Sequence, residues 1–392
     1  MTFPECALSG TPTAEFKHAQ KDLLKPKVNK LAFGGSATHA VRMKALDLFS
    51  GPGGLSIGMK RAGIEPVACV EKGKDAVATY DAHTPTAEHF QSDIRSISFE
   101  RYRGKIDVVF GGPPCQPFST GGLRRGTADA RNMFPEFMRA LKEVQPAAFL
   151  AENVPGLATR NRVQYLAKLL SEFEALGFNV SWHVVLAADY GVPQKRRRLI
   201  IVGMRKGAFW FPKPTHGLDA HIPHVASGSI IDKASPLGEP PDCPVVYAKY
   251  PDPRRSPYAG HVYNGGGRPI DLSAPCHTLL ASAGGYKTHW IDTMDIAPDY
   301  SAHLMAGGSS RDGTVPGARR MTLEESALIQ TFPADMWFAG SRSSQYTQVG
   351  DAVPPMLGHA LGAALHGQLE GTAISPKTHY QPEASLPLLV AA

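Results

Sequence analysis

One cysteine stands in a setting suited to nucleophilic chemistry. Cys115 lies in FGGPPCQPFS, residues 110–119, at the end of the apolar run IDVVF. The two prolines before it fix φ and stiffen the loop, so we expect the thiol at the carboxyl edge of a sheet, where α/β proteins bind ligands. A cysteine is more often an inert core residue, and that interpretation suits the other four. Core cysteines rarely need two prolines and two glycines beside them, so we interpret Cys115 as a nucleophile.

A carboxylate and a basic run follow along the chain. Glu152 ends the strand pattern of AFLAENVPG, and QKRRR (194–198) precedes another apolar run. Because Glu152 and Cys115 both end predicted strands, they can converge on one cleft, as a proton donor and a nucleophile must. A basic run is usually a solvated face. Here Arg196 and Arg198 occupy alternate positions of a strand entry, where two guanidiniums on one side could bind phosphate or steady a carboxylate.

A glycine-rich turn and two acidic residues point to a nucleotide-like cofactor. ALDLFSGPGG, residues 45–54, is an apolar strand that runs into a turn and a helix start. Glycines there let the backbone approach a ligand closely. Glu71 follows the second strand, where a carboxylate can accept hydrogen bonds from both ribose hydroxyls, and Asp93 follows the third strand region and could accept from an adenine amino group. The alternative, that both residues only cap turns, stays open because short motifs are weak signals alone.

These side chains need a sheet and helices to bring them together. From Lys44 onward, short β-branched runs alternate with amphipathic stretches. The expected strands are 45–49, 66–70, 106–111, 148–152, 181–187 and 199–203, and the expected helices are 55–62, 76–82, 134–144 and 163–176. Such alternation predicts an α/β fold with a mostly parallel sheet that is covered on both faces.

The pattern breaks after Met204, where proline and glycine become frequent, and order returns near Met321. Thr322 and Glu325 have the spacing of a helix capping box, and a last helix fits 356–369. We therefore expect a loosely ordered N-terminal extension (1–43), a catalytic and cofactor-binding α/β domain (44–204), a smaller irregular domain (205–318), a return segment that completes the first domain (319–370) and a C-terminal tail (371–392).

Composition excludes several classes of protein. The chain has 392 residues, of which 43% are hydrophobic and 19% charged, as in globular proteins. Its net charge of +6 fits a polyanion partner without requiring one. We find no secretory signal in the first thirty residues and no apolar run near the roughly 18 residues of a spanning helix, so we expect a soluble, cytoplasmic protein with no membrane partner. The five scattered cysteines form no CxxC pair, which argues against a disulfide framework and against a metal site.

Taken in order, these motifs resemble those of the DNA (cytosine-5) methyltransferases. The likeness covers about 44–204 and 319–365 and rests on DLFSGPGG, Glu71, Asp93, PPCQPFS, ENV, QKRRR and QVGDAVPP (348–355). The resemblance implies an α/β, class I S-adenosylmethionine-dependent methyltransferase fold, Rossmann-like, with a smaller target-recognition domain. It implies methyl transfer from S-adenosylmethionine to carbon 5 of a flipped cytosine in a specific short sequence of double-stranded DNA. It further implies a bacterial modification enzyme, with a cognate restriction endonuclease acting on the same site.

The resemblance also assigns roles to residues. Cys115 is the nucleophile and Glu152 its acidic partner, while Arg196 and Arg198 support the flipped base and a nearby phosphate. The implied cofactor-binding residues are Asp47, Phe49, Ser50, Gly51, Gly53, Gly54, Glu71, Asp93, Ile94, Pro114 and Asp351. Asp351 stands where the family usually has asparagine, and a carboxylate there accepts hydrogen bonds but donates none. Thiolate addition at carbon 6 makes carbon 5 nucleophilic, and an acid at ring nitrogen 3 stabilises the developing charge. A stacked base is out of reach, so it must swing out of the duplex.

The same family carries a mobile loop that closes over DNA, and residues 119–131, rich in glycine and arginine, resemble it. The expected DNA contacts are Ser119, Arg124, Arg125 and Arg131 in that segment, and Arg254, Arg255, Tyr286 and Lys287 in the recognition domain. A tRNA cytosine-5 methyltransferase of the same family is the alternative, although the Cys-Phe-Thr tripeptide usual in that branch is missing. A silent DNA-binding module would lack Cys115 or Glu152. A dinucleotide-dependent oxidoreductase leaves PPCQPFS, ENV and QKRRR unexplained.

Overall fold

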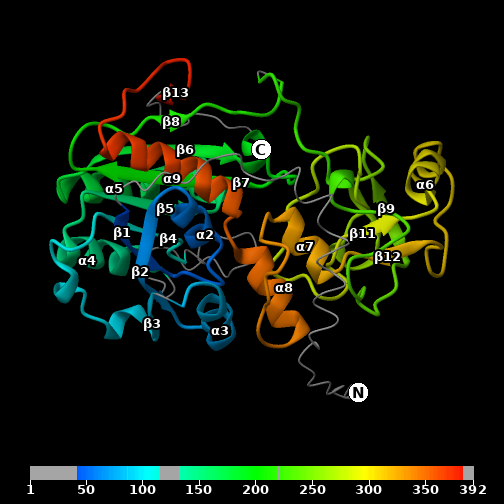
Figure 1. The fold of residues 1–392 in the computed structure, drawn as a ribbon. Helices are drawn as coiled ribbons and strands as arrows, with labels where there is room; N and C mark the ends of the chain where they lie inside the picture. The colour runs from blue at the N-terminus through cyan, green and yellow to red at the C-terminus, as the bar shows by residue number, and fades with distance from the viewer. Residues whose placement is uncertain (1–41, 86, 115–131, 219, 383–392) are drawn as a thin grey trace.

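The computed structural model describes residues 42–85, 87–114, 132–218 and 220–382, and its main feature is a seven-stranded sheet in the order β3-β2-β1-β4-β5-β7-β6 (Figure 1). The strands are β1 (Met43–Leu48), β2 (Ile64–Glu71), β3 (Glu88–Gln91), β4 (Val108–Gly111), β5 (Ala148–Asn153), β6 (Asn179–Leu186) and β7 (Arg197–Met204). β7 is antiparallel to both of its neighbours, and the other pairs are parallel. The predicted mostly parallel sheet is confirmed.

Helices cover both faces of this sheet. They are α2 (Gly54–Arg61), α3 (Lys74–His83), α4 (Phe134–Val144) and α5 (Val163–Ala175), joined later by α9 (Pro355–Leu369). On one face Leu46 packs in a cluster with Phe137 of α4. On the other face the adjacent strand residue Ala45 packs in a cluster with Leu361 of α9. Because successive strand residues point to opposite faces, a sheet covered twice needs apolar residues at nearly every position, which accounts for the uninterrupted apolar runs.

The strand order reverses between β1 and β4. The chain passes from β1 outward to β2 and β3, then returns to the other side of β1 to form β4. In open α/β sheets the connections on either side of such a reversal leave a crevice at the carboxyl ends of the strands, and ligands bind there. The turn after β1 and the segment Gly111–Pro114 after β4 lie at this point.

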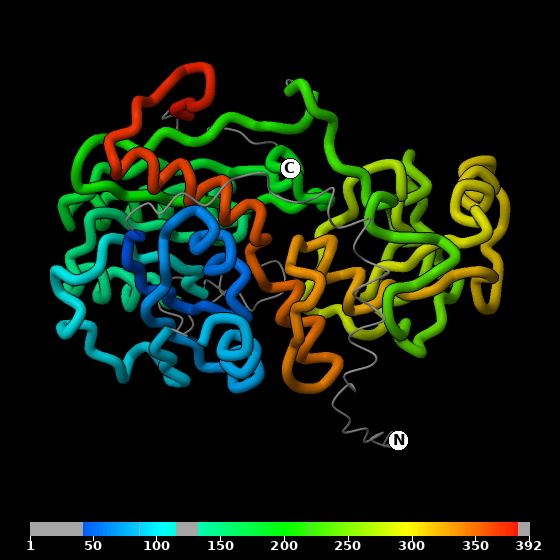
Figure 2. Tube along the Cα trace, viewed as in Figure 1, coloured from blue at the N-terminus to red at the C-terminus, as the bar shows by residue number. Residues whose placement is uncertain are grey.

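The second part of the molecule lies beside the sheet and contains little regular structure (Figure 2). Its elements are β9 (Tyr247–Pro253), β10 (Gly260–Tyr263), β11 (Trp290–Asp292), α6 (Ile296–Met305) and β12 (Ala318–Arg320), and β9 pairs with β10 as β11 does with β12. An aromatic core of Tyr247, Tyr263, Trp290 and Tyr300 stabilises this part. The loop-rich pattern was predicted, but α6 was not.

The chain then returns to the sheet through α7 (Leu323–Ile329), α8 (Arg342–Asp351) and α9, and Figure 1 shows α7 and α8 between the two parts. The predicted capping box is confirmed, because Thr322 Oγ1 accepts from Glu325 N and Glu325 Oε2 accepts from Thr322 N, each at 3.0 Å. α8 was not predicted. The expected tail contains β13 (His379–Tyr380), which pairs with β8 (Phe211–Pro212).

Short 3-10 turns complete the described chain: η2 (Ile94–Ser96), η3 (Glu100–Tyr102), η6 (Pro155–Ala158), η7 (Ala187–Tyr190), η8 (Ser227–Ser229) and η9 (Asn264–Gly266). Of the helices in the described ranges, none combines the length and the apolar character needed to cross a membrane.

Candidate active site at the carboxyl edge of the sheet

A cavity of about 1060 Å³ opens at the carboxyl ends of β1, β2, β4 and β5, with α8 along another side. The sequence-predicted residues that line it are Asp47, Phe49, Ser50, Gly51, Gly54, Glu71, Asp93, Ile94, Pro114, Glu152, Arg198 and Asp351. Among the described residues, the predicted Gly53 and Arg196 are not part of its lining. One cavity therefore holds both the expected cofactor residues and the expected acid.

The turn after β1 is built from residues with positive φ. Phe49 has φ +61°, Gly51 +54° and Gly53 +89°. A side chain disfavours this region, so Phe49 is a strained position at the cavity wall, a feature that no sequence pattern indicated. A Cβ on Gly53 would lie 2.9 Å from the ring of Tyr80, so this glycine shapes the turn from behind the wall.

A buried polar network supports this turn. Asp47 is 1% exposed, and Ser56 Oγ, which donates to its Oδ2 at 2.6 Å, also lies 2.6 Å from the hydroxyl of Tyr80. Burial raises the pKa of Asp47 to about 7, against the lowering by the Ser56 hydrogen bond. The hydroxyl of Ser50 is buried without a hydrogen-bond partner among the described residues. The cavity floor therefore offers a hydroxyl and a carboxyl group to a ligand.

Two further carboxylates stand at the ends of β2 and β3. Glu71 accepts from Gly51 N at 3.0 Å and from Gly73 N at 2.7 Å, which ties the first turn to the second. Asp93 is held by the guanidinium of Arg95, with Nε at 2.9 Å and Nη2 at 2.7 Å, and these bonds keep its pKa well below the usual range. Each carboxylate oxygen has two lone pairs, and each oxygen of Glu71 accepts one bond, so Glu71 retains room for a ligand donor. Asp93 already accepts from Arg95 N, Nε and Nη2 and from Lys72 Nζ, so a ligand donor there would replace one of these bonds.

Glu152 ends β5 beside Arg198 of β7. Arg198 Nε lies 2.6 Å from Glu152 Oε1, and the side chains are 11% and 12% exposed. Burial raises the pKa of Glu152 above its ordinary value, and the positive charges of Arg198 and then Arg196 oppose the rise. A raised pKa favours the protonated carboxyl group more than in a free glutamate, which suits an acid partner.

The neighbouring Asn153 holds the proline segment. Its Nδ2 donates to Pro113 O at 2.9 Å, and its Oδ1 accepts from Val154 N at 2.9 Å. Met133 N donates to Pro114 O at 3.0 Å. Cys115 itself lies outside the described residues, as do Ser119, Arg124, Arg125 and Arg131.

Arg196, which was predicted to support the flipped base, lies outside the cavity lining. It is 1% exposed, and its Nη1 donates to Leu279 O at 3.2 Å while its Nη2 donates to Gly350 O at 2.7 Å. Burial lowers its pKa well below the ordinary value, and the charge of Arg198 adds to that effect. In this structure its guanidinium joins backbone segments.

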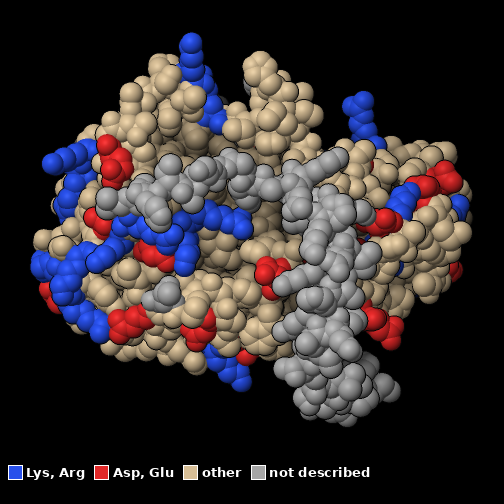
Figure 3. Space-filling model, viewed as in Figure 1, with Lys and Arg blue, Asp and Glu red and all other residues tan. Residues whose placement is uncertain are grey.

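The predicted DNA contacts in the smaller part are at the surface. Arg254 and Arg255 are exposed beside the β9–β10 hairpin, and Arg254 Nη2 forms a 2.8 Å ion pair with Asp252. Tyr286 is 53% exposed, and Lys287 next to it is exposed as well. On the face in Figure 3, Lys and Arg side chains form a band over the part that contains the sheet.

The sequence reasoning missed the contribution of α8 to the cavity. Ser341, Ser343, Ser344 and Thr347 line it from the first two turns of this helix. Ser341 caps the helix by accepting from Ser344 N, and a serine three residues before another small polar residue is the signal that could have located this start. Within the described ranges, no group of three or more His, Cys, Asp or Glu is arranged to hold a metal ion.

Known proteins resemble this chain over most of its length. The family model described as C-5 cytosine-specific DNA methylase matches residues 43–235 and 280–367. The Type II methyltransferase M.AplI of Arthrospira platensis is 34% identical over 87% of this chain and 90% of its own length. M.PspPI of a Psychrobacter species is 34% identical over 82% of this chain and 78% of its own, and M1.HphI of Haemophilus parahaemolyticus is 32% identical over 83% and 87%.

Solved structures share the fold at lower identity. The Entamoeba histolytica methyltransferase EhMeth has a TM-score of 0.59 and 15% identity, with 84% of this chain and 99% of that chain covered. A Spodoptera frugiperda DNMT2 mutant has a TM-score of 0.57 and 18% identity, with coverages of 83% and 99%. The expected class I methyltransferase fold is confirmed.

Proposed function

This chain belongs to the C-5 cytosine-specific DNA methylase family and is a DNA cytosine-5 methyltransferase, and we propose that it acts on one cytosine of a short specific sequence in double-stranded DNA. The target base swings out of the duplex, because neither face of a stacked base is open to attack. S-adenosylmethionine is the proposed methyl donor. Type II methyltransferases among the relatives support a protective role beside a restriction endonuclease that cuts the same site.

The described residues fit that donor. The unpartnered hydroxyl of Ser50 and the strained turn at Phe49 and Gly51 suit close approach by a polar ligand. Glu71 is placed to accept from ribose hydroxyls, and Asp93 and Ile94 line the same cavity. About 1060 Å³ is at the upper end of the range for a ligand pocket, which is ample for a cofactor of this size. The donor supplies a methyl group on a cationic sulfur, which a carbon nucleophile can take.

The proposed chemistry begins with a thiolate. The Cys115 sulfur forms a bond to carbon 6 of cytosine, and the electron pair released makes carbon 5 nucleophilic. Glu152 donates a hydrogen bond or proton to ring nitrogen 3 as charge develops there. Carbon 5 takes the methyl group as the donor's sulfur–methyl bond breaks, which would leave the donor as a neutral thioether. A base removes the carbon 5 proton, Glu152 takes back any proton given to nitrogen 3, and the sulfur–carbon 6 bond breaks to release 5-methylcytosine and the thiolate.

The observation that carries this proposal is the Glu152–Arg198 pair in the cavity that Glu71 and Pro114 also line. Arg198 fixes Glu152 in one orientation while burial favours its protonated form. Asn153 holds Pro113, two residues before Cys115, at 2.9 Å. An acid and the segment that leads to the proposed nucleophile therefore border one space, as base methylation requires.

Bisulfite sequencing of unmethylated plasmid DNA treated with the purified protein and S-adenosylmethionine tests the proposal. Cytosines protected within one short sequence are expected with the wild type and with Cys243→Ala, a matched control whose cysteine is remote from the cavity lining. Cys115→Ala is expected to protect none while binding DNA and donor. Turnover by Cys115→Ala would overturn the covalent mechanism. A wild type that leaves DNA unprotected but methylates tRNA would overturn the choice of substrate.

A further inference from the structure

A row of alternating side chains joins the catalytic carboxyl group to the smaller part of the molecule. Gln194, Arg196 and Arg198 stand at every second position where the chain enters β7. Arg198 holds Glu152 at 2.6 Å, as described above. The other two side chains are almost fully buried, at 0% and 1% exposure, and both reach the segment 276–283 of the smaller part.

The backbone N–H and C=O of Leu279 both hydrogen-bond to these side chains. Leu279 N donates to Gln194 Oε1 at 3.0 Å, and Leu279 O accepts from Arg196 Nη1 at 3.2 Å. We call this contact between the β7 entry and segment 276–283 the joint. Backbone hydrogen bonds add to it, because Lys195 N donates to Cys276 O at 2.7 Å and Cys276 N donates to Pro193 O at 2.9 Å. The position of this segment is therefore fixed directly against the strand entry that carries Arg198.

A third buried side chain extends the joint to α8. Gln194 Nε2 donates to Gln330 Oε1, and Gln330 Nε2 donates to Val349 O at 3.0 Å and to Ala352 O at 2.7 Å. Those two carbonyls bracket Asp351, which lines the cavity. Gln330 is 0% exposed, so water cannot easily take the place of its hydrogen-bond partners if the joint loosens.

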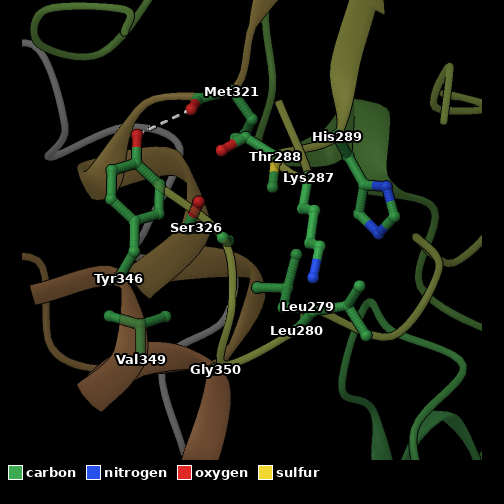
Figure 4. Close-up of a pocket in the computed structure, with 11 residues that line it drawn as sticks. Leu279, Leu280, Lys287, Thr288, His289, Met321, Ser326, Tyr346, Val349 and Gly350 are labelled. Atoms are coloured by element: carbon green, nitrogen blue, oxygen red, sulfur yellow. Dashed lines mark hydrogen bonds between the residues drawn. The ribbon is translucent and has the colours of Figure 1, made fainter. Parts of the chain in front are cut away.

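The joint is also tightly packed. Leu279 of the segment packs in one cluster with Val349 of α8, and Figure 4 shows both among the residues that line a small space here. The space among these side chains is about 10 Å³, which is at most one water. A Cβ on Gly350 would lie 2.4 Å from Leu280 O, so the close approach depends on glycine. Because the backbones of the segment and of α8 approach this closely, movement of the segment bears on α8.

The segment leads directly to exposed groups. Leu280 is 41% and Tyr286 is 53% exposed, and Lys287 follows. Tyr286 and Lys287 are proposed DNA contacts. DNA bound to them would therefore affect the position of the segment that Gln194 and Arg196 hold through Leu279. Burying the charged guanidinium of Arg196 costs free energy, and its hydrogen bonds to carbonyl groups do not neutralise the charge. This cost indicates that Arg196 has a positioning role at this joint.

We propose that Gln194, Arg196 and Gln330 are positioning residues that link DNA held at Tyr286 and Lys287, just after segment 276–283, to the placement of Glu152 and Asp351, so that the correct sequence is methylated faster than a near match. The inference rests on the proposed function. Gln194, Arg196 and Gln330 act through Arg198 and α8. Only correctly bound DNA gains from the link, because a mismatched site does not set the segment in place.

Gln194→Met tests the link, since methionine fills similar volume and loses both hydrogen bonds. Gln345→Met is the matched control, because Gln345 on α8 makes a comparable 2.9 Å bond to Phe338 O away from the joint. Single-turnover rates per active enzyme are measured at the methylated sequence and at sites with one base changed, by bisulfite sequencing over time. We expect Gln194→Met to lower the rate at the correct site about tenfold and the mismatch rates little, with donor binding unchanged.

Other outcomes have separate meanings. Equal slowing at correct and mismatched sites, or wild-type discrimination, would overturn the link. A wild type without DNA methylation would overturn the proposed function instead. If Gln194→Met fails to fold, Arg196→Lys serves, because a lysine keeps the charge but cannot bridge Leu279 O and Gly350 O together. It is expected to lose discrimination in the same way, and unchanged discrimination would count against the link.

Discussion

Replacing Asn153 by alanine tests whether this side chain holds the proline segment before the proposed nucleophile. Asn153 is 7% exposed and makes two 2.9 Å hydrogen bonds, to Pro113 O and from Val154 N. Alanine leaves both backbone groups without that partner, and an unsatisfied buried group costs about 1–3 kcal/mol. The cost for the N–H of Val154 is at the lower end of that range because Val154 is partly exposed, whereas the carbonyl of Pro113 is buried and costs more. The free energy of unfolding should therefore fall by about 2–4 kcal/mol.

The effect on catalysis should be larger than the effect on binding. Pro114 O keeps its 3.0 Å bond from Met133 N, so the segment is loosened without being released. A displacement of about 1 Å at a reacting group can cost about 100-fold, so we expect the single-turnover methylation rate to fall about 10- to 100-fold. Urea unfolding measures the first effect, and methyl transfer from labelled donor, normalised to folded protein, measures the second.

Asn153→Asp separates the two hydrogen bonds. Aspartate still accepts from Val154 N, but it has no donor for Pro113 O and sets oxygen against oxygen. It should therefore slow methylation at least as much as alanine does. A rate close to that of the wild type in Asn153→Asp would refute the role given to the Pro113 contact, and so would a normal rate in Asn153→Ala.

Three further predictions concern the cofactor, the DNA and pH. Glu71→Ala should weaken S-adenosylmethionine binding about 10- to 100-fold, since charge-assisted hydrogen bonds of about 1.5–3 kcal/mol are lost; calorimetry checks this, and an unchanged dissociation constant would contradict the assignment. DNA affinity should fall steeply between about 50 and 200 mM salt, because phosphate neutralisation releases counterions, and a flat titration would count against a basic DNA-binding face. Burial raises the pKa of Asp47 from 3.8 to about 7, so the folded protein keeps a proton that the unfolded chain has lost, and stability falls as pH rises through this window. Relative to Asp47→Asn, the wild type should lose up to about 4 kcal/mol between pH 4 and 7 in urea unfolding, and parallel curves would show that Asp47 titrates normally.

The sequence predicted the sheet and twelve of the residues that line the cavity because both depend on local pattern. Apolar runs that end in glycine, proline or a carboxylate mark the carboxyl ends of parallel strands, and those ends meet at one edge whatever the loops do. Glu71, Glu152 and the glycines after β1 accordingly line one cavity or shape its turn. Helix α4 was predicted at 134–144, where proline starts it and the apolar period is strong.

Helix α8 was not predicted, because its residues carry little helical pattern. Its buried residues are Tyr346, Gln348, Val349 and Gly350, a stripe too polar to read as a core face. Its position depends on partners far away in the chain, such as Thr79, whose hydroxyl donates to Gln348 Oε1 at 2.6 Å. A helix held by long-range polar contacts carries little of its own signal, and its serines in the cavity wall were missed for that reason.

The two arginines of the basic run show where sequence ends and tertiary structure begins. Arg196 and Arg198 were predicted to act together, because alternate strand residues share a side. β7 pairs with β5, which sets Arg198 beside Glu152, whereas Arg196 precedes β7 and meets Leu279 and Gly350. Residue types and spacing thus determined which chemistry the chain can carry. Which charge faces the cavity and which is buried in the joint was decided by strand pairing and by segments 83 and 154 residues away, whose contacts no local pattern encodes.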